Sequence, residues 1–271
     1  MGNESAVPSS IWRDVSRIRA EAPLVHNITN YVVMNSTANA LLAMGASPVM
    51  AHAIEEVAEM AGLARALVLN IGTLSVAWIE AMVAAGLRAK ARGIPIVLDP
   101  VGAGATGFRT ETAWRLVRET SPAIIRANAS EIRALVHREH GTKGVDSAHG
   151  SEEAVIAARA LSAECGAVVS VSGAVDVIVS GSALTRVSNG HPLMPRVTGL
   201  GCTATALTGA FAAVNPSPFE AAVHAMAVMG IAGEMAGEHA QGPGSFQMHF
   251  LDALFLLKES DIESRLRIER A

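Results

Sequence analysis

The chain has 271 residues, of which 17% are charged and 50% hydrophobic, and its formal net charge at pH 7 is −4. This length suits one α/β domain with a full apolar core, and we find no internal repeat or linker, so we expect a single domain over residues 1–271. The charge balance leaves no basic surface for nucleic acid or an acidic membrane. Charged residues make up about a quarter of a typical soluble domain, so the deficit here favours a homo-oligomer that buries part of its surface.

The cysteine count, residues 1–10 and one long uncharged stretch bear on the cellular compartment of the protein. Cys165 and Cys202 are too few for a disulfide framework and favour a reducing environment. Residues 1–10 lack the basic start and apolar core of a secretory signal. The uncharged stretch between Arg196 and Glu220 is rich in Gly, Ala and Thr and contains two prolines, which argues against a membrane span. We therefore expect a cytoplasmic protein that binds neither membranes nor nucleic acid.

Short apolar runs typical of buried strands alternate with Ala-rich helical segments over most of the chain. We predict strands at 47–50, 66–70, 94–99, 123–126 and 167–172, and helices near 34–44, 75–92, 110–119 and 151–164. Strands that are apolar along their whole length are buried on both faces. The pattern therefore predicts an α/β fold whose central, mostly parallel sheet is flanked by helices on both faces.

The last third of the chain is predicted to change character. Residues 176–179 and 183–187, joined by Ser180-Gly181-Ser182, predict a hairpin of antiparallel edge strands. Helices are expected at 203–214, 218–237 and about 246–258, and the charged tail at 259–270 is expected to be a solvated helix or a frayed end. The loop at 138–150 is expected to be the most mobile surface segment.

The most informative motif is the run VTGLGCTATA at 197–206, in which two glycines precede a helix of small residues. Glycines let backbone N–H groups converge on a ligand, and the first turn of a helix adds unpaired donors and partial positive charge. Gly199 and Gly201 are therefore candidates for an anion site, with Cys202 beside it as nucleophile or base. A tight turn with a buried cysteine explains the same residues, so the choice depends on the rest of the chain.

Polar residues end several predicted strands, where ligands bind in an open parallel sheet. Asn70, Asp99, Arg126 and Ser172 each lie at such an end, and Glu131 follows five residues after Arg126. Two carboxylates, an arginine and a hydroxyl along one edge suit a nucleotide and a divalent cation. Each also has a purely structural explanation, such as a turn for Asp99, a helix start for Glu131 or a surface ion pair for Arg126.

The segment GAGATG at 102–107 matches the G-x-G-x-x-G pattern of dinucleotide-binding folds, which raises an oxidoreductase as an alternative. In that pattern the glycines open the helix directly, whereas here the helix is expected to begin near Phe108, after the glycines. The next strand also ends in Arg126 instead of the acidic residue that holds a ribose. Both differences argue against this class.

Several blocks resemble the hydroxyethylthiazole kinases of the thiamine pathway, which belong to the ribokinase-like superfamily. The blocks are PLVH at 23–26, NSTAN at 35–39, GASPVM at 45–50, LNIGTL at 69–74, LDPVGAGATG at 98–107 and GPGSFQ at 242–247. The resemblance implies a ribokinase-like fold and transfer of the ATP γ-phosphate to the primary alcohol of 4-methyl-5-(2-hydroxyethyl)thiazole, with Mg²⁺. It also implies a homotrimer whose thiazole pockets lie between subunits.

By position, the resemblance assigns roles to residues of this sequence. Four would contact the thiazole and its hydroxyethyl arm: Asn30, Val32, Met50 and Gly199. Three would hold the nucleotide: Arg126, Asn128 and Ser172. Asp99 and Glu131, the latter in an Asn128-x-x-Glu131 pattern shared across the superfamily, would organise Mg²⁺ and its waters. The turn with Gly199 and Gly201 would form the anion hole.

Two departures from the resemblance leave alternatives open. Cys202 stands where sugar kinases of the superfamily carry a catalytic aspartate, and we expect the helix N-terminus to lower its pKa and make some thiolate available. Leu200 stands where we expect Ala or Thr in the family. The alternatives are a kinase for another alcohol such as hydroxymethylpyrimidine, and a non-catalytic thiazole- or nucleotide-binding protein.

Overall fold

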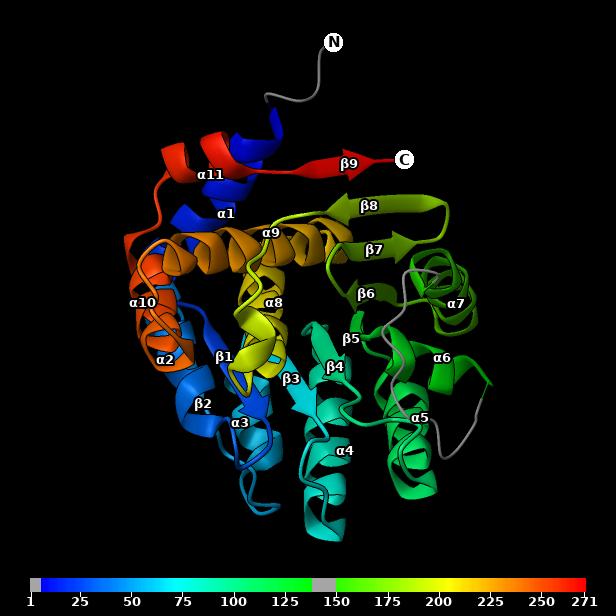
Figure 1. Ribbon diagram of the computed structural model, residues 1–271. Coiled ribbons are helices and arrows are strands. Elements are labelled where there is room, and N and C mark those ends of the chain that lie inside the picture. Colours follow the sequence, from blue (N-terminus) through cyan, green and yellow to red (C-terminus); the bar gives the residue numbers. More distant parts are fainter. Residues whose placement is uncertain (1–5, 138–149) are drawn as a thin grey trace.

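The computed structural model describes residues 6–137 and 150–271, which contain one nine-stranded sheet of order β2-β1-β3-β4-β5-β6-β7-β8-β9 (Figure 1). The parallel strands are β1 (Leu24–Ile28), β2 (Ser47–Val49), β3 (Ala66–Asn70), β4 (Ile96–Asp99), β5 (Ile124–Asn128) and β6 (Val168–Ser172). The antiparallel strands are β7 (Asp176–Ser180), β8 (Ala183–Val187) and β9 (Ile268–Arg270). The predicted mostly parallel sheet is confirmed. The loop expected to be mobile at 138–150 lies, except for Gly150, outside the described residues.

Helices cover both faces of the sheet, as predicted. One layer contains α3 (Val57–Leu63), α4 (Val76–Ala91), α5 (Gly107–Thr120), α6 (Ala129–His137) and α7 (Gly150–Cys165). The other contains α1 (Ala6–Glu21), α2 (Met34–Met44), α8 (Leu200–Val214), α9 (Pro218–Gly237), α10 (Pro243–Leu256) and α11 (Glu259–Arg265). Within the described chain, no helix is long and apolar enough to cross a bilayer.

The strand β3 shows why the central strands are apolar along their whole length. All five of its residues are buried. Ala66 and Val68 belong to the core on the α8 side of the sheet, whereas Leu67 and Leu69 belong to the core on the α4 side. Because successive side chains of a strand point to opposite faces, a sheet covered on both sides requires apolar residues at every position.

Several elements differ from the sequence prediction: α1 and α3 were not predicted, and α5 and α10 each begin three residues early. The helix α8 begins at Leu200, three residues earlier than expected, because the Thr203 N–H donates to the Gly199 carbonyl at 2.8 Å and closes the first turn there. The first part of the tail is the expected helix, α11, but its last residues are not frayed, since they form β9, which pairs with β8. Arg270 of β9 also makes two hydrogen bonds to the Glu220 carboxylate of α9, at 2.9 and 2.7 Å.

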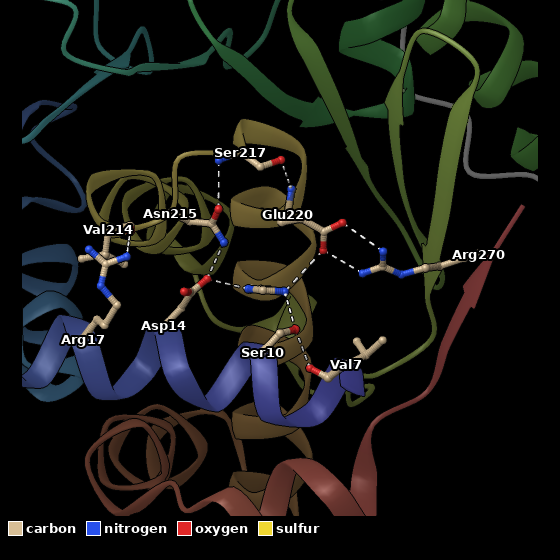
Figure 2. Close-up of polar contacts among 10 residues, drawn as sticks. Val7, Ser10, Asp14, Arg17, Val214, Asn215, Ser217, Glu220 and Arg270 are labelled. Carbon is tan, nitrogen blue, oxygen red and sulfur yellow. Dashed lines mark hydrogen bonds and ion pairs between the residues drawn. The ribbon is translucent and has the colours of Figure 1, made fainter. Parts of the chain in front are cut away.

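A buried ionic cluster joins α1, α9 and β9 (Figure 2). His224 Nδ1 lies 2.7 Å from Asp14 Oδ2, and its Nε2 lies 3.5 Å from Glu220 Oε2. Both His224 and Asp14 are only 1% exposed, and Asn215 donates to Asp14 at 2.6 Å. Burial opposes the charge on the imidazole, but the hydrogen bonds to Asp14 and Glu220 outweigh it and raise the pKa of His224. The two carboxylates on either side of His224 therefore favour its charged form.

We expect His224→Gln to lower the free energy of unfolding by about 3 kcal/mol at pH 6, because it leaves Asp14 buried without its ionic partner. A folded-state pKa above the unfolded value of about 6.5 gives stability that is complete below pH 6.5 and is lost as pH rises through the folded pKa. The difference between variant and wild type should therefore shrink from pH 6 to pH 9 in urea unfolding. The matched control is His239→Gln, at an exposed histidine, which should show no difference at either pH. A difference that grows toward pH 9 would contradict the charged state of His224.

Candidate active site

The carboxyl ends of neighbouring parallel strands meet the first turn of α8. Asn30 follows β1, Asn70 ends β3, Asp99 ends β4 and Arg126 lies in β5. The register pairs Asn70 directly with Asp99. The helix α8 packs on β1, β3 and β4, which brings Cys202 of its first turn to this edge. The structure thus gathers four of the predicted site residues: Asn30, Asp99, Arg126 and Cys202.

A chain of hydrogen bonds joins Cys202 to Asp99. Asn30 Nδ2 donates to Cys202 Sγ at 3.4 Å and to Asn70 Oδ1 at 2.9 Å. Asn70 Nδ2 donates to Asp99 Oδ2 at 2.8 Å, and Thr205 Oγ1 donates to the same oxygen at 2.6 Å. The two asparagines, the aspartate and the threonine are all buried. Polar groups buried this deeply must be paired, so the chain fixes each side chain in one orientation.

Asn70 was named as a polar strand end but given no role, and Thr205 was not predicted. Asn70 had a visible signal, because a polar residue ended a buried strand beside one that ended in Asp99. Thr205 follows Cys202 by three residues, a spacing that puts both on one face of a helix, but a threonine in an apolar helix carried no signal of its own.

Burial raises the pKa of Asp99 to about 7, and the charge of Glu131 acts in the same direction. The positive charge of Arg126 and the hydrogen bonds from Thr205 and Asn70 oppose this rise. A carboxyl with this pKa is partly protonated at neutral pH. A cation beside it would favour the ionised form.

The expectation that the helix N-terminus lowers the pKa of Cys202 is wrong. Burial and the negative charge of Asp99 raise its pKa to about 11, and the side-chain amides of Asn70 and Asn30 and the charge of Arg126 offset only part of this. A thiol with this pKa is protonated at neutral pH. Cys202 therefore presents a hydrogen-bonding S–H group at the site, and not a ready thiolate.

The glycine turn has the geometry expected of an anion site. Gly199 has a φ of 85°, and a Cβ there would lie 2.7 Å from Val33 Cγ1, so only glycine fits. As the N-cap of α8 it offers no side chain to the first-turn N–H groups. These donors point out of the helix end toward the edge of the sheet and are available to a ligand.

Arg126 is 8% exposed, and its Nη1 donates to the Gly201 carbonyl at 2.9 Å. Its Nε has no partner among the described residues, so the guanidinium keeps donors for a further anion. Ser172, paired with Asn128 on the neighbouring strand, lies on the same side and donates weakly to the Ala127 carbonyl at 3.4 Å. These residues form the far end of the site from Asn30.

Asn128 and Glu131 make the hydrogen bonds of a helix start. Asn128 Oδ1 accepts from the Glu131 N–H at 2.9 Å, and Glu131 Oε2 accepts from the Asn128 N–H at 2.9 Å. Glu131 Oε1 also accepts from the Gly102 N–H at 2.8 Å, which ties the loop after β4 to α6. Both carboxylate oxygens are thus engaged by backbone. Any contact of Glu131 with a cation is best made through water.

The donor set suits a weakly chelated, hydrated cation. In residues 6–137 and 150–271, no three His, Cys, Asp or Glu side chains gather into a metal-binding group. Mg²⁺ keeps several waters and binds proteins through one or two carboxylates together with substrate phosphates. Asp99 and Glu131 fit that requirement.

The two remaining predicted residues, Val32 and Met50, lie at the rim of the site. β1 pairs with β2, so the segments after them, with Asn30, Val32 and Met50, leave the sheet side by side. Val32 and its neighbour Tyr31 are each 65% exposed, and Met50 is half-buried. The Tyr31 ring packs on buried Trp78, with a centroid distance of 4.7 Å. An apolar rim therefore stands open next to the buried polar chain.

The loop at 102–107 is engaged by contacts within the chain. The helix α5 begins at Gly107, and the Thr106 side chain caps it by accepting from the Arg109 N–H at 3.3 Å. The Arg109 guanidinium donates to the carbonyls of Ile71, Gly72 and Val101 and so binds this loop to the one after β3. The helix thus begins at the last glycine of the motif, whereas we expected it to begin after the glycines, so this argument against an oxidoreductase is not confirmed; the Thr106 cap and the Arg109 contacts do engage this loop within the chain.

Comparison with known proteins shows which family the chain resembles. Residues 15–260 match the Hydroxyethylthiazole kinase family. A hydroxyethylthiazole kinase of Syntrophus aciditrophicus (strain SB) is 63% identical over 262 residues, which cover 96% of this chain and 97% of that protein. A solved hydroxyethylthiazole kinase protein from Pyrococcus horikoshii OT3 is 46% identical, with a TM-score of 0.91 over 97% of this chain and 99% of that one.

A more distant structure shares the fold alone. The pyridoxal kinase from Staphylococcus aureus, solved with AMP-PCP and pyridoxal, is 15% identical with a TM-score of 0.64, over 92% of this chain and 98% of that one. The fold is thus ribokinase-like, as the resemblance implied. Together with the match over 15–260, these similarities show that the chain belongs to the hydroxyethylthiazole kinase family.

Proposed function

We propose that this protein transfers the γ-phosphoryl group of ATP to the primary alcohol of 4-methyl-5-(2-hydroxyethyl)thiazole, in thiamine biosynthesis or salvage. Family membership supports this activity. The observation that carries it is the first turn of α8, which has no side-chain cap and contains the half-buried Cys202, linked by hydrogen bonds through Asn30 and Asn70 to the buried Asp99. Such a turn offers hydrogen-bond donors to a transferring phosphoryl group beside a side chain that can hold the alcohol.

In the proposed reaction the alcohol oxygen forms a bond to the γ-phosphorus while the bond from that phosphorus to the β,γ-bridging oxygen breaks, and the electron pair leaves with ADP. The transition state is loose, so the hydroxyl proton is released late and finally passes to water. A protonated thiol can therefore serve by orienting the alcohol. Cys202 does this without a covalent intermediate, and Gly199 and Gly201 let the backbone donors approach the phosphoryl oxygens.

The other residues at the edge of the sheet bind the thiazole, ATP or the cation. Asn30, Val32 and Met50 contact the thiazole. Arg126, Asn128 and Ser172 hold ATP. Asp99 and Glu131 would hold Mg²⁺, which would neutralise phosphate charge when bound. We place the reaction in the cytoplasm, which the two free cysteines, Cys165 and Cys202, support.

The function is tested by ADP production from ATP in the purified protein. We expect turnover that requires both hydroxyethylthiazole and Mg²⁺ and that stops when EDTA removes the ion. Hydroxymethylpyrimidine and ribose are the control acceptors and should give at most background rates. Thiazole binding without turnover would instead identify a non-catalytic thiazole-binding protein, and turnover with hydroxymethylpyrimidine alone would identify a kinase for that alcohol.

We expect Cys202→Ala to lower kcat at least about 100-fold, since positioned groups of this kind contribute that much to a rate. Cys202→Asp should keep or raise the rate, because a carboxylate can both orient the alcohol and accept its proton. Cys165→Ala is the matched control, as this cysteine lies at the end of α7, away from the strand ends of the site, and should leave kcat unchanged. Trapping of phosphate on Cys202 during turnover would refute the non-covalent role.

We also propose a homotrimer whose subunits complete the thiazole pocket. The exposed apolar residues beside Asn30 and Met50 support this: Tyr31, Val32 and Ile54, which are 65%, 65% and 50% exposed. Light scattering should give three times the chain mass of 28.1 kDa. Tyr31→Glu and Val32→Glu together should shift the species to a smaller mass and raise KM for the thiazole. A wild-type protein that is a stable monomer and still phosphorylates the thiazole would rule out the shared pocket.

A further inference from the structure

Asn70 lies between the Cys202 thiol and the Asp99 carboxylate. The proposed reaction requires these two groups to keep a fixed relative position. Its Nδ2 donates to Asp99 Oδ2 at 2.8 Å, and its Oδ1 accepts from Asn30 Nδ2, which also donates to Cys202. We propose that Asn70 is a positioning residue for phosphoryl transfer, which fixes the acceptor side of the site relative to the cation side. The inference rests on the roles proposed above for Cys202 and Asp99.

The Asn70 amide has only one workable orientation. Its Oδ1 accepts two hydrogen bonds, from the Gly72 N–H at 3.0 Å and from Asn30 at 2.9 Å. A flipped amide would place its own N–H groups against both of these donors and its oxygen against Asp99, so three hydrogen bonds would be lost. Asn70 is 1% exposed, and water cannot replace them. The side chain is therefore locked, and its direction does not change with pH, since an amide does not titrate.

The backbone at the ends of β1 and β3 leaves room for the hydrogen bond between Asn30 and Asn70. Asn30 uses both Nδ2 hydrogens, for Asn70 and Cys202, and its Oδ1 accepts from the Val32 N–H at 3.1 Å. A Cβ on residue 72 would lie 2.6 Å from Asn30 Nδ2, so the turn after β3 needs Gly72 for the two asparagines to meet. The paired amides are thus a built feature of the two strand ends.

The arrangement also sets how Asp99 faces a ligand. Asn70 and Thr205 both donate to Oδ2, so within the described chain Oδ1 is the oxygen left for a cation or its water. Asn70 and Asp99 are register partners at the ends of adjacent strands, which are more rigid than loops. A shift of about 1 Å in such a constellation can reduce a rate about 100-fold.

The test uses two variants of Asn70 in the full-length kinase. Asn70→Ala removes both links, and Asn70→Asp keeps the acceptor oxygen toward Asn30 and Gly72 but, when ionised, cannot donate to Asp99. We expect each to lower kcat about 100-fold with the thiazole KM changed less than about 3-fold, the pattern of an interaction that acts in the transition state. Thr205→Val should cost less, about 10-fold, because the chain to Cys202 stays intact. Gln241→Ala, at an exposed amide, is the control with unchanged kcat.

A double-mutant cycle separates positioning from structural support. Asn70→Ala added to Cys202→Ala should lower kcat by much less than the product of the two single losses, because groups that act as a unit are not additive. Losses that multiply, or a kcat of folded Asn70→Ala within 2-fold of wild type, would overturn the inference. Thermal unfolding of each variant corrects kcat for the folded fraction. If Cys202→Ala and Asp99→Asn keep full activity, the proposed site itself is wrong, and the two failures are thereby distinguished.

Discussion

The burial of one carboxylate, Asp99, is the constraint from which the rest of the site follows. An isolated carboxylate in a protein core is costly unless it is hydrogen-bonded and faces positive charge. Asp99 receives two hydrogen bonds, from Asn70 at the end of β3 and from Thr205 in α8, and Arg126 of β5 supplies the charge. Three elements must therefore meet at the end of β4, and that meeting brings the first turn of α8 to the edge of the sheet.

The same burial changes what Cys202 can do. The sequence places it at a helix N-terminus, where a thiol is usually activated, yet the buried site and the nearby Asp99 raise its pKa to about 11. A neutral thiol is a poor base and still a good ligand for a hydroxyl. Phosphoryl transfer depends on alignment and charge neutralisation more than on a strong base, so the environment that weakens the thiol as a base suits the proposed chemistry.

Sequence reasoning succeeded where the signal is periodic or local. The apolar runs of β3 and β4 require a covered sheet, so the fold follows from the sequence, and Gly199 marks the turn before α8, where the candidate residues gather. Sequence reasoning missed the contacts between residues that lie far apart in the chain and meet only in the folded sheet. The contact of Asn30 with Asn70 spans forty residues, and β9 pairs with β8, about eighty residues earlier in the chain. The environment that sets the pKa of Cys202 is equally a property of the assembled site, in which burial outweighs the helix end.

The helix α8 links these parts because it is held at both ends. At its amino end, Thr205 binds Asp99 and the Gly201 carbonyl binds Arg126. At its carboxyl end, Arg17 of α1 donates to the Val214 carbonyl, and Asn215 donates to Asp14 of the cluster around His224 (Figure 2). The Arg17 cation satisfies a carbonyl at the helix C-terminus that has no partner within the helix, and the Asn215 amide ties the residue after the helix to the cluster. The ionic cluster lies away from the site and anchors the far end of α8. The first turn of the same helix presents Cys202. The rigidity of the proposed reaction centre therefore depends on contacts at both ends of one buried helix.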